Sequence, residues 1–332
     1  MSYYDVIIIG GGPAGAAASY DLSKAGFSAL ILDKKEFPRF KACAGAVTAK
    51  ALSHLRFSID SIVHNTSNMI ILGKEGLPEY QALTSDLPFC ALTIRSELDK
   101  FCLDKSLKNG VKFDLISGLK SLDEQKDGVT IISKDNRSFS CRYLIGADGV
   151  HSQVRKLSKQ FKENKNAFAI EATVLLAHCS FVPACTFNFG IVPNGYGWIF
   201  PKHDHVNVGI YTQDDDKKII SKAVLYDYVW KKLGTDKLEN ICGFPLGIGG
   251  EHYKPASNRI FLVGDAAGMT EPIFGEGIQN AIKSGQAVAK ALIQAKQGDI
   301  TPRQAVIQSI AIVQKESSQQ SLKRASLVKS VS

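Results

Sequence analysis

The first part of the chain alternates between short apolar runs and one segment rich in alanine. Residues 4–9 are rich in Ile and Val, which is typical of a buried parallel strand. Residues 14–25 are rich in alanine and end before Gly26, a residue suited to a helix C-terminus. A second apolar run, residues 28–32, ends at Asp33. The pattern predicts strand, helix and strand, the repeating unit of an α/β fold.

Aromatic residues alternate with other residues later in the chain, over residues 194–201 (NGYGWIFP). In a strand this spacing puts Tyr196, Trp198 and Phe200 on one side. Gly195 and Gly197 would leave the other side clear for close approach. The sequence KHD follows and precedes HVNVGIYT, so we expect a β-hairpin. The pattern alone fits either an ordinary buried strand or a wall built for a flat ring.

Composition indicates a globular protein with two lobes. The chain has 332 residues, of which 45% are hydrophobic and 22% charged. No apolar run approaches the roughly 18 residues of a membrane span, and the N-terminus shows no signal peptide. The seven cysteines are scattered and include no C-x-x-C pair. We therefore expect no disulfide framework, no zinc site and a cytoplasmic location, with peripheral attachment to a membrane surface as the alternative.

The net charge of +8 has two interpretations. It fits an ordinary solvated surface, or attraction to an anionic partner such as a phosphate-bearing substrate or a lipid surface. Lys323, Arg324 and Lys329 make the C-terminal end basic, and we expect a frayed basic tail there. No basic stripe with interleaved aromatic residues is present, so nucleic acid is not an expected partner. The seven histidines form no metal-binding pattern.

A glycine motif joins the first predicted strand to the helix. Gly10, Gly12 and Gly15 fit G-x-G-x-x-G, and Asp33 follows the second strand. The three glycines would allow a tight turn, close approach of a pyrophosphate, and close packing of helix on strand. The helix N-terminus favours phosphate, and Asp33 can accept hydrogen bonds from a ribose. The motif predicts dinucleotide binding but does not separate FAD from NAD(P).

Two later stretches have similar chemistry. Residues 143–156 contain the sequence GADG, whose Asp-Gly turn can direct amides at a phosphate or flavin, and Ser152 can cap the next helix. Residues 259–268 form a predicted strand followed by GDAAG, which puts Asp265 at the end of that strand. Gly275 and Gly277 would leave room for a ring system at a helix N-terminus. Each stretch alone could be an ordinary glycine-rich connection.

Together, the three stretches resemble the p-hydroxybenzoate hydroxylase-like superfamily of FAD-dependent oxidoreductases. The pattern P-x-x-Y-x-W-x-F-P at 193–201 resembles the geranylgeranyl reductase family within it. Cys43 and Gly45 match a loop of that family in which Cys and Gly are commonly adjacent, although Ala44 separates them here. Members are commonly longer, so we expect a shorter or differently roofed isoprenoid tunnel.

The resemblance implies an α/β fold, α+β overall, with a Rossmann-like FAD-binding lobe and a second, mostly antiparallel β-sheet lobe that holds substrate. The FAD lobe would be discontinuous, and the predicted ranges are 1–70, 90–160 and 255–300 for it, 71–89 and 161–254 for the substrate lobe, and 301–332 for a C-terminal helix and basic tail.

The resemblance also implies a set of site residues. Arg95 matches an arginine that lies near the flavin's phosphate and ribityl region, although it could simply pair with Glu97 or Asp99. The full set expected around the cofactor is Gly10, Gly12, Pro13, Ala14, Gly15, Asp33, Lys34, Cys43, Ala44, Gly45, Arg95, Asp148, Gly264, Asp265, Gly275, Gly277 and Ile278. The substrate would be lined by Tyr196, Trp198, Phe200 and Pro272. Cys43, Tyr196 and Trp198 are the expected catalytic residues, and Glu276 is a further acid-base candidate.

The implied activity is reduction of carbon–carbon double bonds in an apolar, isoprenoid-like substrate by hydride from reduced flavin. NAD(P)H would act as a transient reductant, or electrons would come from a carrier protein. One alternative is a flavin-dependent monooxygenase or halogenase, although the halogenase pattern W-x-W-x-I-P has Trp where Tyr196 stands and Ile where Phe200 stands. Another alternative is a flavoprotein electron carrier or quinone-linked oxidoreductase. A flavin-free binding protein is the remaining interpretation.

Overall fold

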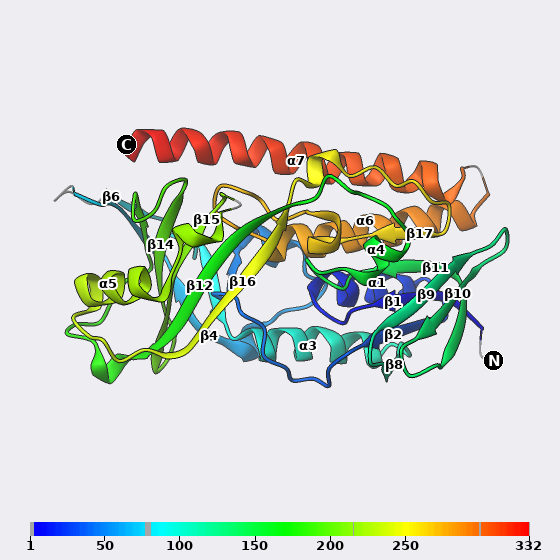
Figure 1. The fold of residues 1–332 in the computed structure, drawn as a ribbon, viewed down its shortest axis with the longest axis horizontal. Coiled ribbons are helices and arrows are strands. Elements are labelled where there is room, and N and C mark those ends of the chain that lie inside the picture. The colour runs from blue at the N-terminus through cyan, green and yellow to red at the C-terminus, as the bar shows by residue number, and fades with distance from the viewer. Residues whose placement is uncertain (1–2, 77–80, 215, 299, 332) are drawn as a thin grey trace.

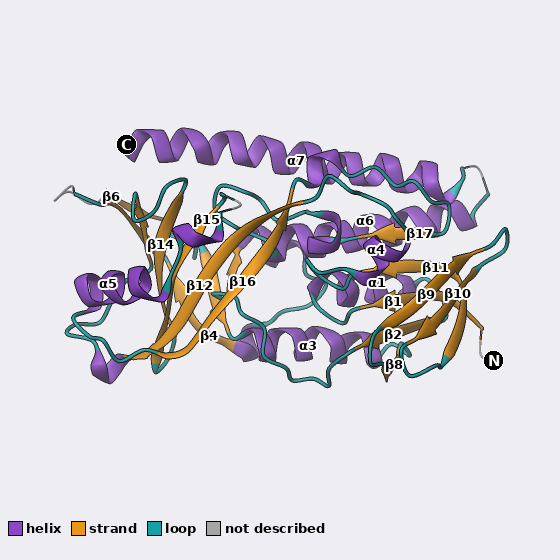
Figure 2. Cartoon of the chain, in the orientation of Figure 1, coloured by secondary structure: helices purple, strands orange, loops and turns teal. Residues whose placement is uncertain are grey.

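The structure is a computed structural model that describes residues 3–76, 81–214, 216–298 and 300–331. Figure 1 shows two lobes side by side, with one long helix, α7 (Pro302–Val331), running along the top of both. Figure 2 shows that the lobe holding the N-terminus mixes helices and strands, whereas the other consists mainly of strands. The predicted fold class, an α/β lobe beside a second β-sheet lobe, is confirmed.

The first lobe is built on a seven-stranded sheet with a parallel centre. β1 (Tyr3–Ile9) lies between β2 (Ala29–Asp33) and β11 (Ser138–Gly146) and pairs with both in parallel. Its residues 6–9 are buried, as expected for a parallel strand covered on both faces. The other strands are β8 (Lys112–Leu115), β9 (Leu119–Glu124), β10 (Val129–Ser133) and β17 (Ile260–Leu262), in the order β8-β2-β1-β11-β10-β9 with β17 beside β11.

Helices pack beside this sheet and against one another. The predicted alanine-rich helix is α1 (Pro13–Lys24), which contacts both α3 (Arg95–Leu107) and α6 (Ile278–Lys296). A Cβ at Gly285 of α6 would lie 2.2 Å from the carbonyl oxygen of Ala14, so small residues are what let these two helices approach. Shorter helices are α2 (Ala49–His54) and α4 (Gln153–Leu157), with 3₁₀ turns at Asp60–Ile62, Leu176–His178, Lys217–Ile219, Gly250–His252 and Gly264–Ala267.

The second lobe is a seven-stranded sheet that is antiparallel except between β13 and β5. β14 (Gly195–Pro201) and β15 (His205–Thr212) form the predicted hairpin. The other strands are β5 (Met69–Lys74), β6 (Gln81–Thr84), β12 (Lys165–Leu175), β13 (Thr186–Phe189) and β16 (Glu239–Ile248), in the order β16-β12-β15-β14-β13-β5-β6. The domain limits drawn from the sequence stay a prediction.

The two faces of this second sheet have different partners. Residues such as Ile170, Ile199 and Val208 pack on the face covered by α5 (Lys222–Leu233). Gly197 also lies on this side, where an added Cβ would be 2.4 Å from Cζ of Tyr228. The close approach expected at Gly197 is therefore confirmed, and the group that approaches is the ring of Tyr228 in α5.

A small three-stranded sheet connects the cores of the lobes. Its strands are β3 (Ala46–Thr48), β7 (Cys90–Thr93) and β4 (Val63–Ser67), in the order β3-β7-β4. Cys90 and Leu92 belong to the core beneath the second sheet, whereas Val47 packs with residues of α1 and α6. The loop 34–45, which runs into β3, is thus fixed at the junction of the lobes.

α7 packs along α6 and extends over the second lobe to Val331. The segment expected to be a frayed basic tail is therefore helical, which corrects that prediction. Along the described part of the chain, no helix combines the length and the apolar character that crossing a membrane requires.

Candidate active site

The glycine motif forms the expected tight turn between β1 and α1. Gly10 has a φ of +105°, and a Cβ on it would lie 2.4 Å from the Ala147 carbonyl oxygen. A Cβ on Gly15 would lie 1.9 Å from the Gly10 carbonyl oxygen. At Gly12, by contrast, the nearest atom to an added Cβ is a guanidinium nitrogen of Arg39, at 3.5 Å. Gly10 and Gly15 thus allow the backbone to pack closely, whereas Gly12 leaves an open space at the start of α1.

The N-terminus of α1 has no side-chain cap. Gly12 is the N-cap residue, Pro13 is the first helical residue, and Ala14 is buried behind it. Asp33, at the end of β2, accepts the backbone N–H groups of Gly11 at 2.8 Å and Lys34 at 2.7 Å. The helix therefore presents free N–H groups and a positive dipole end beside an ordered carboxylate.

Three cations gather next to this turn. Arg95 makes a two-point ion pair with Asp99, with nitrogen–oxygen distances of 2.9 and 3.0 Å, and Arg39 approaches the same carboxylate at 3.3 Å. Burial lowers the pKa of Lys41 to about 8, although the charge of Asp265 opposes this and Arg95 adds to it. One fully buried carboxylate, Asp99, is thus shared by two arginines, and Lys41 has no ion pair within 4.0 Å among the described residues.

The third glycine stretch closes the other end of the site. The carboxylate of Asp265 accepts the Thr270 hydroxyl at 2.8 Å. Gly277 is the N-cap of α6, and its Cβ position lies 3.6 Å from the same carboxylate. Gly275, at a φ of +62°, packs against the ring of Tyr211. The N–H of Gly264 donates to the Ser284 hydroxyl oxygen at 2.9 Å. Ile278 is the first residue of α6 and is buried.

The side chain of Asp148, in the GADG stretch, is hydrogen-bonded to the start of the following helix. Its carboxylate accepts the Ser152 hydroxyl at 2.5 Å and the Gln153 N–H at 2.6 Å. Ser152 in turn caps α4, as predicted, by accepting the Arg155 N–H. The Asp148 side chain therefore organises the start of α4, and a contact with cofactor stays a prediction.

The loop from Cys43 to Gly45 is held from several directions. Gly45 has a φ of +70°, and a Cβ on it would lie 2.0 Å from the Thr93 carbonyl oxygen. Lys202, which follows β14, donates to the carbonyl oxygens of Ala44 at 2.7 Å and Thr93 at 3.0 Å. Burial lowers the pKa of this lysine to about 8. Lys202 therefore ties the end of the aromatic strand to the loop.

Tyr196, Trp198 and Phe200 lie on the face of the second sheet that packs against this loop. All three are buried, and Ala44 and Phe274 belong to the same cluster. The Tyr196 hydroxyl donates to the Phe274 carbonyl oxygen at 2.5 Å, and the Tyr211 hydroxyl donates to that of Pro272 at 2.6 Å. The predicted substrate-lining residues are thus brought together, next to the loop that carries Cys43.

Glu171 of β12 is a site residue that sequence reasoning missed. It is buried on the same face, and it accepts the Cys43 N–H at 3.0 Å. In the sheet register, Glu171 is opposite Gly209, and Gly209 is opposite Trp198. The indole of Trp198 donates to the side chain of Asn207 at 2.7 Å. The one available signal was an acid inside the alternating strand FAIEATVLL.

Replacing Gly209 with alanine is expected to lower the free energy of unfolding by about 1–3 kcal/mol, because the core is overpacked. The added Cβ would lie 2.2 Å from Cζ2 of Trp198. Urea denaturation measures this loss, and tryptophan fluorescence in a Trp230→Phe background reports the displaced indole. Gly243→Ala is the matched control, since its Cβ would meet only the Ala169 carbonyl oxygen, at 3.7 Å. Equal stabilities for the two variants would contradict the packing described.

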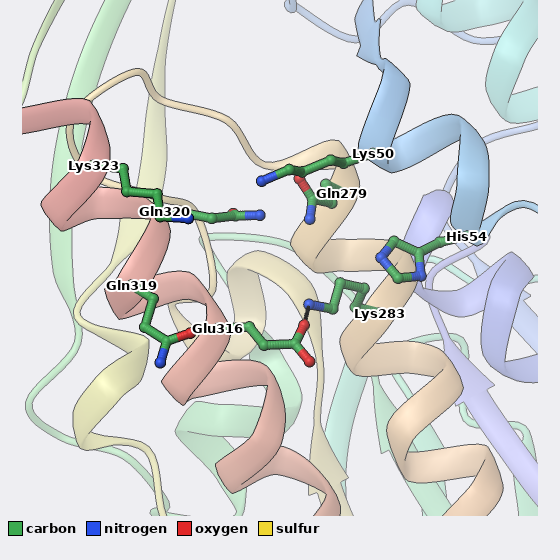
Figure 3. A pocket seen from close by; sticks show the side chains of 8 residues that line it. All are labelled: Lys50, His54, Gln279, Lys283, Glu316, Gln319, Gln320 and Lys323. Carbon is green, nitrogen blue, oxygen red and sulfur yellow. Dashed lines mark hydrogen bonds and ion pairs between the residues drawn. The ribbon is translucent and has the colours of Figure 1, made fainter. Parts of the chain in front are cut away.

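Figure 3 shows a separate cavity of about 240 Å³ between α2, α6 and α7. Its lining is polar, and Lys283 on one side forms an ion pair with Glu316 on the other. The lining residues are Lys50, His54, Gln279, Lys283, Glu316, Gln319, Gln320 and Lys323. None of the predicted cofactor or substrate residues is among them, so this cavity is not the candidate active site.

The residues present fit the FAD that the resemblance implies. A dinucleotide needs a backbone that its phosphates can approach, and Gly12 supplies that space at an uncapped helix N-terminus. Its phosphates also need positive charge nearby. The combined positive charge of Arg39, Lys41 and Arg95 exceeds the single negative charge of Asp99 beside them. The uncapped N-terminus of α6 offers a second set of N–H groups near Asp265.

Two family models match the chain. The FAD binding domain matches residues 3–180, and the geranylgeranyl reductase catalytic domain matches residues 180–247. The second match covers β13, β14 and β15, which include the aromatic face and Asn207.

Relatives match over most of their length. The chain is 36% identical to an uncharacterized protein of Methanosarcina barkeri, over 92% of this chain and 79% of that protein. It is 28% identical to the digeranylgeranylglycerophospholipid reductase of Methanococcus vannielii, over 85% of this chain and 75% of that protein. A geranylgeranyl bacteriochlorophyll reductase-like structure from Thermoplasma acidophilum superposes with a TM-score of 0.83 at 23% identity, over 98% of this chain and 86% of the other.

Proposed function

The chain belongs to the geranylgeranyl reductase family of FAD-dependent oxidoreductases, and from this we propose that it reduces carbon–carbon double bonds of an isoprenoid substrate. The relatives that match it include enzymes named for reducing such substrates. The match to a reductase catalytic domain favours this activity over the halogenase alternative. So do Tyr196 and Phe200, which replace the Trp and Ile of the halogenase pattern.

The observation that carries the proposal is the aromatic face of the second sheet. Tyr196, Trp198 and Phe200 pack with Ala44 of the Cys43 loop, so the wall next to the candidate cofactor site is apolar. Apolar and aromatic walls suit a hydrocarbon chain, which gains free energy on leaving water. Bound FAD, when reduced, supplies the hydride for such a reaction.

We expect the FAD to be held by the residues named from the sequence. The amides at the start of α1 and the cations Arg39, Lys41 and Arg95 would hold the diphosphate, while Asp33 would accept a ribose hydroxyl. Asp265 and the N-terminus of α6 would hold the flavin end. The Cys43–Gly45 loop and the aromatic face would position the double bond and exclude water.

The reductant and the location belong to the same proposal. We expect NAD(P)H or an electron-carrier protein to act transiently, since the sequence contains a single dinucleotide-binding motif. An isoprenoid substrate partitions into membranes, so we expect a cytoplasmic protein that contacts a membrane surface peripherally.

A direct test is anaerobic turnover of the FAD-loaded chain, reduced with dithionite, on geranylgeranyl diphosphate. Mass spectrometry should detect product that has gained two hydrogen atoms for each bond reduced. Flavin that stays reduced, with no hydrogenated product, would contradict a reductase of this substrate, and reoxidation of that flavin by an added quinone would favour the electron-carrier alternative.

FAD affinity is expected to fall as the pH rises through about 8, because Lys41 carries a lowered pKa of about 8 in the free chain. A neighbouring diphosphate favours the charged lysine, so binding raises its pKa and takes up a proton above that pH. Below about pH 8 the lysine is already charged in the free chain, and affinity should be constant. Quenching of flavin fluorescence measures the dissociation constant of FAD. The Lys41→Met variant should bind FAD more weakly than the wild type, and its affinity should not decline as the pH rises through 8. A decline that persists in Lys41→Met would contradict the assignment.

A further inference from the structure

Glu171 is a carboxyl group placed inside an otherwise apolar part of the second sheet. Its neighbours in sequence, Ile170 and Ala172, face α5, which leaves the Glu171 side chain on the face toward Cys43. The residue is only 7% exposed. A buried carboxylate is costly unless it is paired or hydrogen-bonded, so a glutamate here needs a reason.

The hydrogen bonds of Glu171 lead to the two segments that border the candidate site. One oxygen accepts the Cys43 N–H at 3.0 Å, which holds the loop. The Asn207 side chain is the second partner, and its oxygen is occupied by the indole N–H of Trp198. Glu171 thus connects the Cys43 loop, through Asn207, with the aromatic wall.

No described cation forms an ion pair with Glu171 within 4.0 Å. Burial therefore raises the pKa of Glu171, although the hydrogen bonds from Cys43 and Asn207 and the charges of Arg95 and Lys41 oppose the rise. Lys202 also faces this region, but its ammonium group donates to backbone carbonyls. The carboxyl group can hold a proton at a pH where a surface glutamate has lost it.

Two other acid-base candidates, Tyr196 and Glu276, are already engaged. The Tyr196 hydroxyl is bound to the Phe274 carbonyl oxygen, and Glu276 is paired with Arg324 and accepts the Thr48 hydroxyl. These contacts fix the proton of Tyr196 and keep Glu276 beside a positive charge. Glu171 is the acid on the aromatic face, and among the described residues it has hydrogen-bond donors but no cation within 4.0 Å.

We propose that Glu171 supplies the proton that completes double-bond reduction, an inference that rests on the proposed function. The double bond breaks as one carbon receives a hydride, with its two electrons, from reduced flavin. The other carbon receives the proton from the Glu171 carboxyl group. Glu171 is left as a carboxylate and regains a proton from water, while NAD(P)H or an electron carrier restores the flavin.

The first readout needs neither cofactor nor substrate. Infrared spectroscopy of the flavin-free chain during a pH titration should show the carbonyl stretch of a protonated, buried carboxyl group that persists to a higher pH than the bands of exposed carboxyl groups. That band should be absent in Glu171→Gln, which keeps the shape and can keep the hydrogen bond from the Cys43 N–H but cannot ionise. Glu239→Gln is the matched control, because Glu239 lies at the exposed end of neighbouring β16 and should leave the band unchanged.

The second readout is turnover of geranylgeranyl diphosphate by the dithionite-reduced, FAD-loaded chain. Glu171→Gln should bind FAD as tightly as the wild type but turn over about 100-fold or more slowly. Wild-type turnover should fall as the pH rises through the Glu171 pKa, and the variant should lack this decline. Burial lowers the pKa of both Lys41 and Lys202 to about 8. A second decline in turnover near pH 8, caused by these lysines, should therefore remain in the Glu171→Gln variant. The Glu171→Gln variant also keeps the thiols of Cys43 and of Cys242, which is the cross-strand neighbour of Glu171.

The outcomes separate the two proposals. A missing band in the wild type would overturn the protonated Glu171, and so would wild-type turnover by Glu171→Gln. Restored turnover in Glu171→Asp, with a shifted pH profile, would support proton transfer over a merely structural role. A wild-type chain that shows the band but reduces no prenyl substrate would contradict the proposed function, and with it the proton transfer.

Discussion

Replacing Gly15 with alanine should abolish stable FAD binding and lower the free energy of unfolding by about 3 kcal/mol or more, at the upper end of the range for overpacking. The reason is backbone overlap, since the new Cβ would lie 1.9 Å from the Gly10 carbonyl oxygen. No side chain can rotate away to relieve it. α1 would have to move off β1, which displaces the N–H groups expected to hold the diphosphate. Urea denaturation and the retained flavin absorbance after gel filtration measure the two effects.

Gly12→Ala is the informative companion to this variant. Its added Cβ would be 3.5 Å from a side-chain nitrogen of Arg39, so the flavin-free protein should be almost as stable as the wild type. FAD affinity should nevertheless fall, because the methyl group takes the space expected for a phosphate. Gly26→Ala, where nothing lies within 4 Å, serves as a control that keeps FAD and loses only about 1 kcal/mol for its positive φ. Tight FAD binding by both Gly12→Ala and Gly15→Ala would contradict the cofactor site.

The first lobe was largely predictable because its signals are local. The run that ends at Ile9, the turn at Gly10 and the alanine-rich helix follow one another within a single unit, and each needs only its neighbours to be understood. Ser152 at the start of α4 and the hairpin of β14 and β15 were predictable for the same reason.

The second lobe was less predictable because its contacts join distant segments. The parallel pairing of β5 with β13 connects residues more than a hundred positions apart, and no local pattern encodes it. The sequence predicted room for a close approach at Gly197 but not the approaching group, because the helix that supplies Tyr228 lies some thirty residues later. Glu171 was missed for a similar reason, since its partners Cys43 and Asn207 come from opposite directions along the chain.

The C-terminal helix shows most clearly how a distant segment can support the site. Arg324, expected in a frayed tail, donates to Glu271 at 2.7 Å and also pairs with Glu276. The Glu271 side chain is 1% exposed and accepts the N–H groups of Ile273 and Phe274, both at 2.9 Å. One arginine of α7 thus neutralises two buried carboxylates in the segment that leads into α6.

Replacing Arg324 with alanine is therefore expected to cost about 3–5 kcal/mol, the range for breaking a buried ion pair by removing one partner. Most of this loss arises because Glu271 and Glu276 stay buried without their cation. The segment 271–277 should then exchange its amide hydrogens faster, and FAD should bind more weakly because Gly275 and Gly277 lie in it. Denaturation and hydrogen exchange measure the effects.

Lys323→Ala is the matched control, since Lys323 is the adjacent exposed residue and a surface change usually costs within about 0.5 kcal/mol. Arg324→Lys should fall between the two, because an ammonium group keeps the charge but lacks the planar fork that reaches both carboxylates. If Arg324→Ala were no less stable than Lys323→Ala, the end of α7 would be a passive cover. A large difference would instead make this helix part of the structure that holds the flavin end of the site.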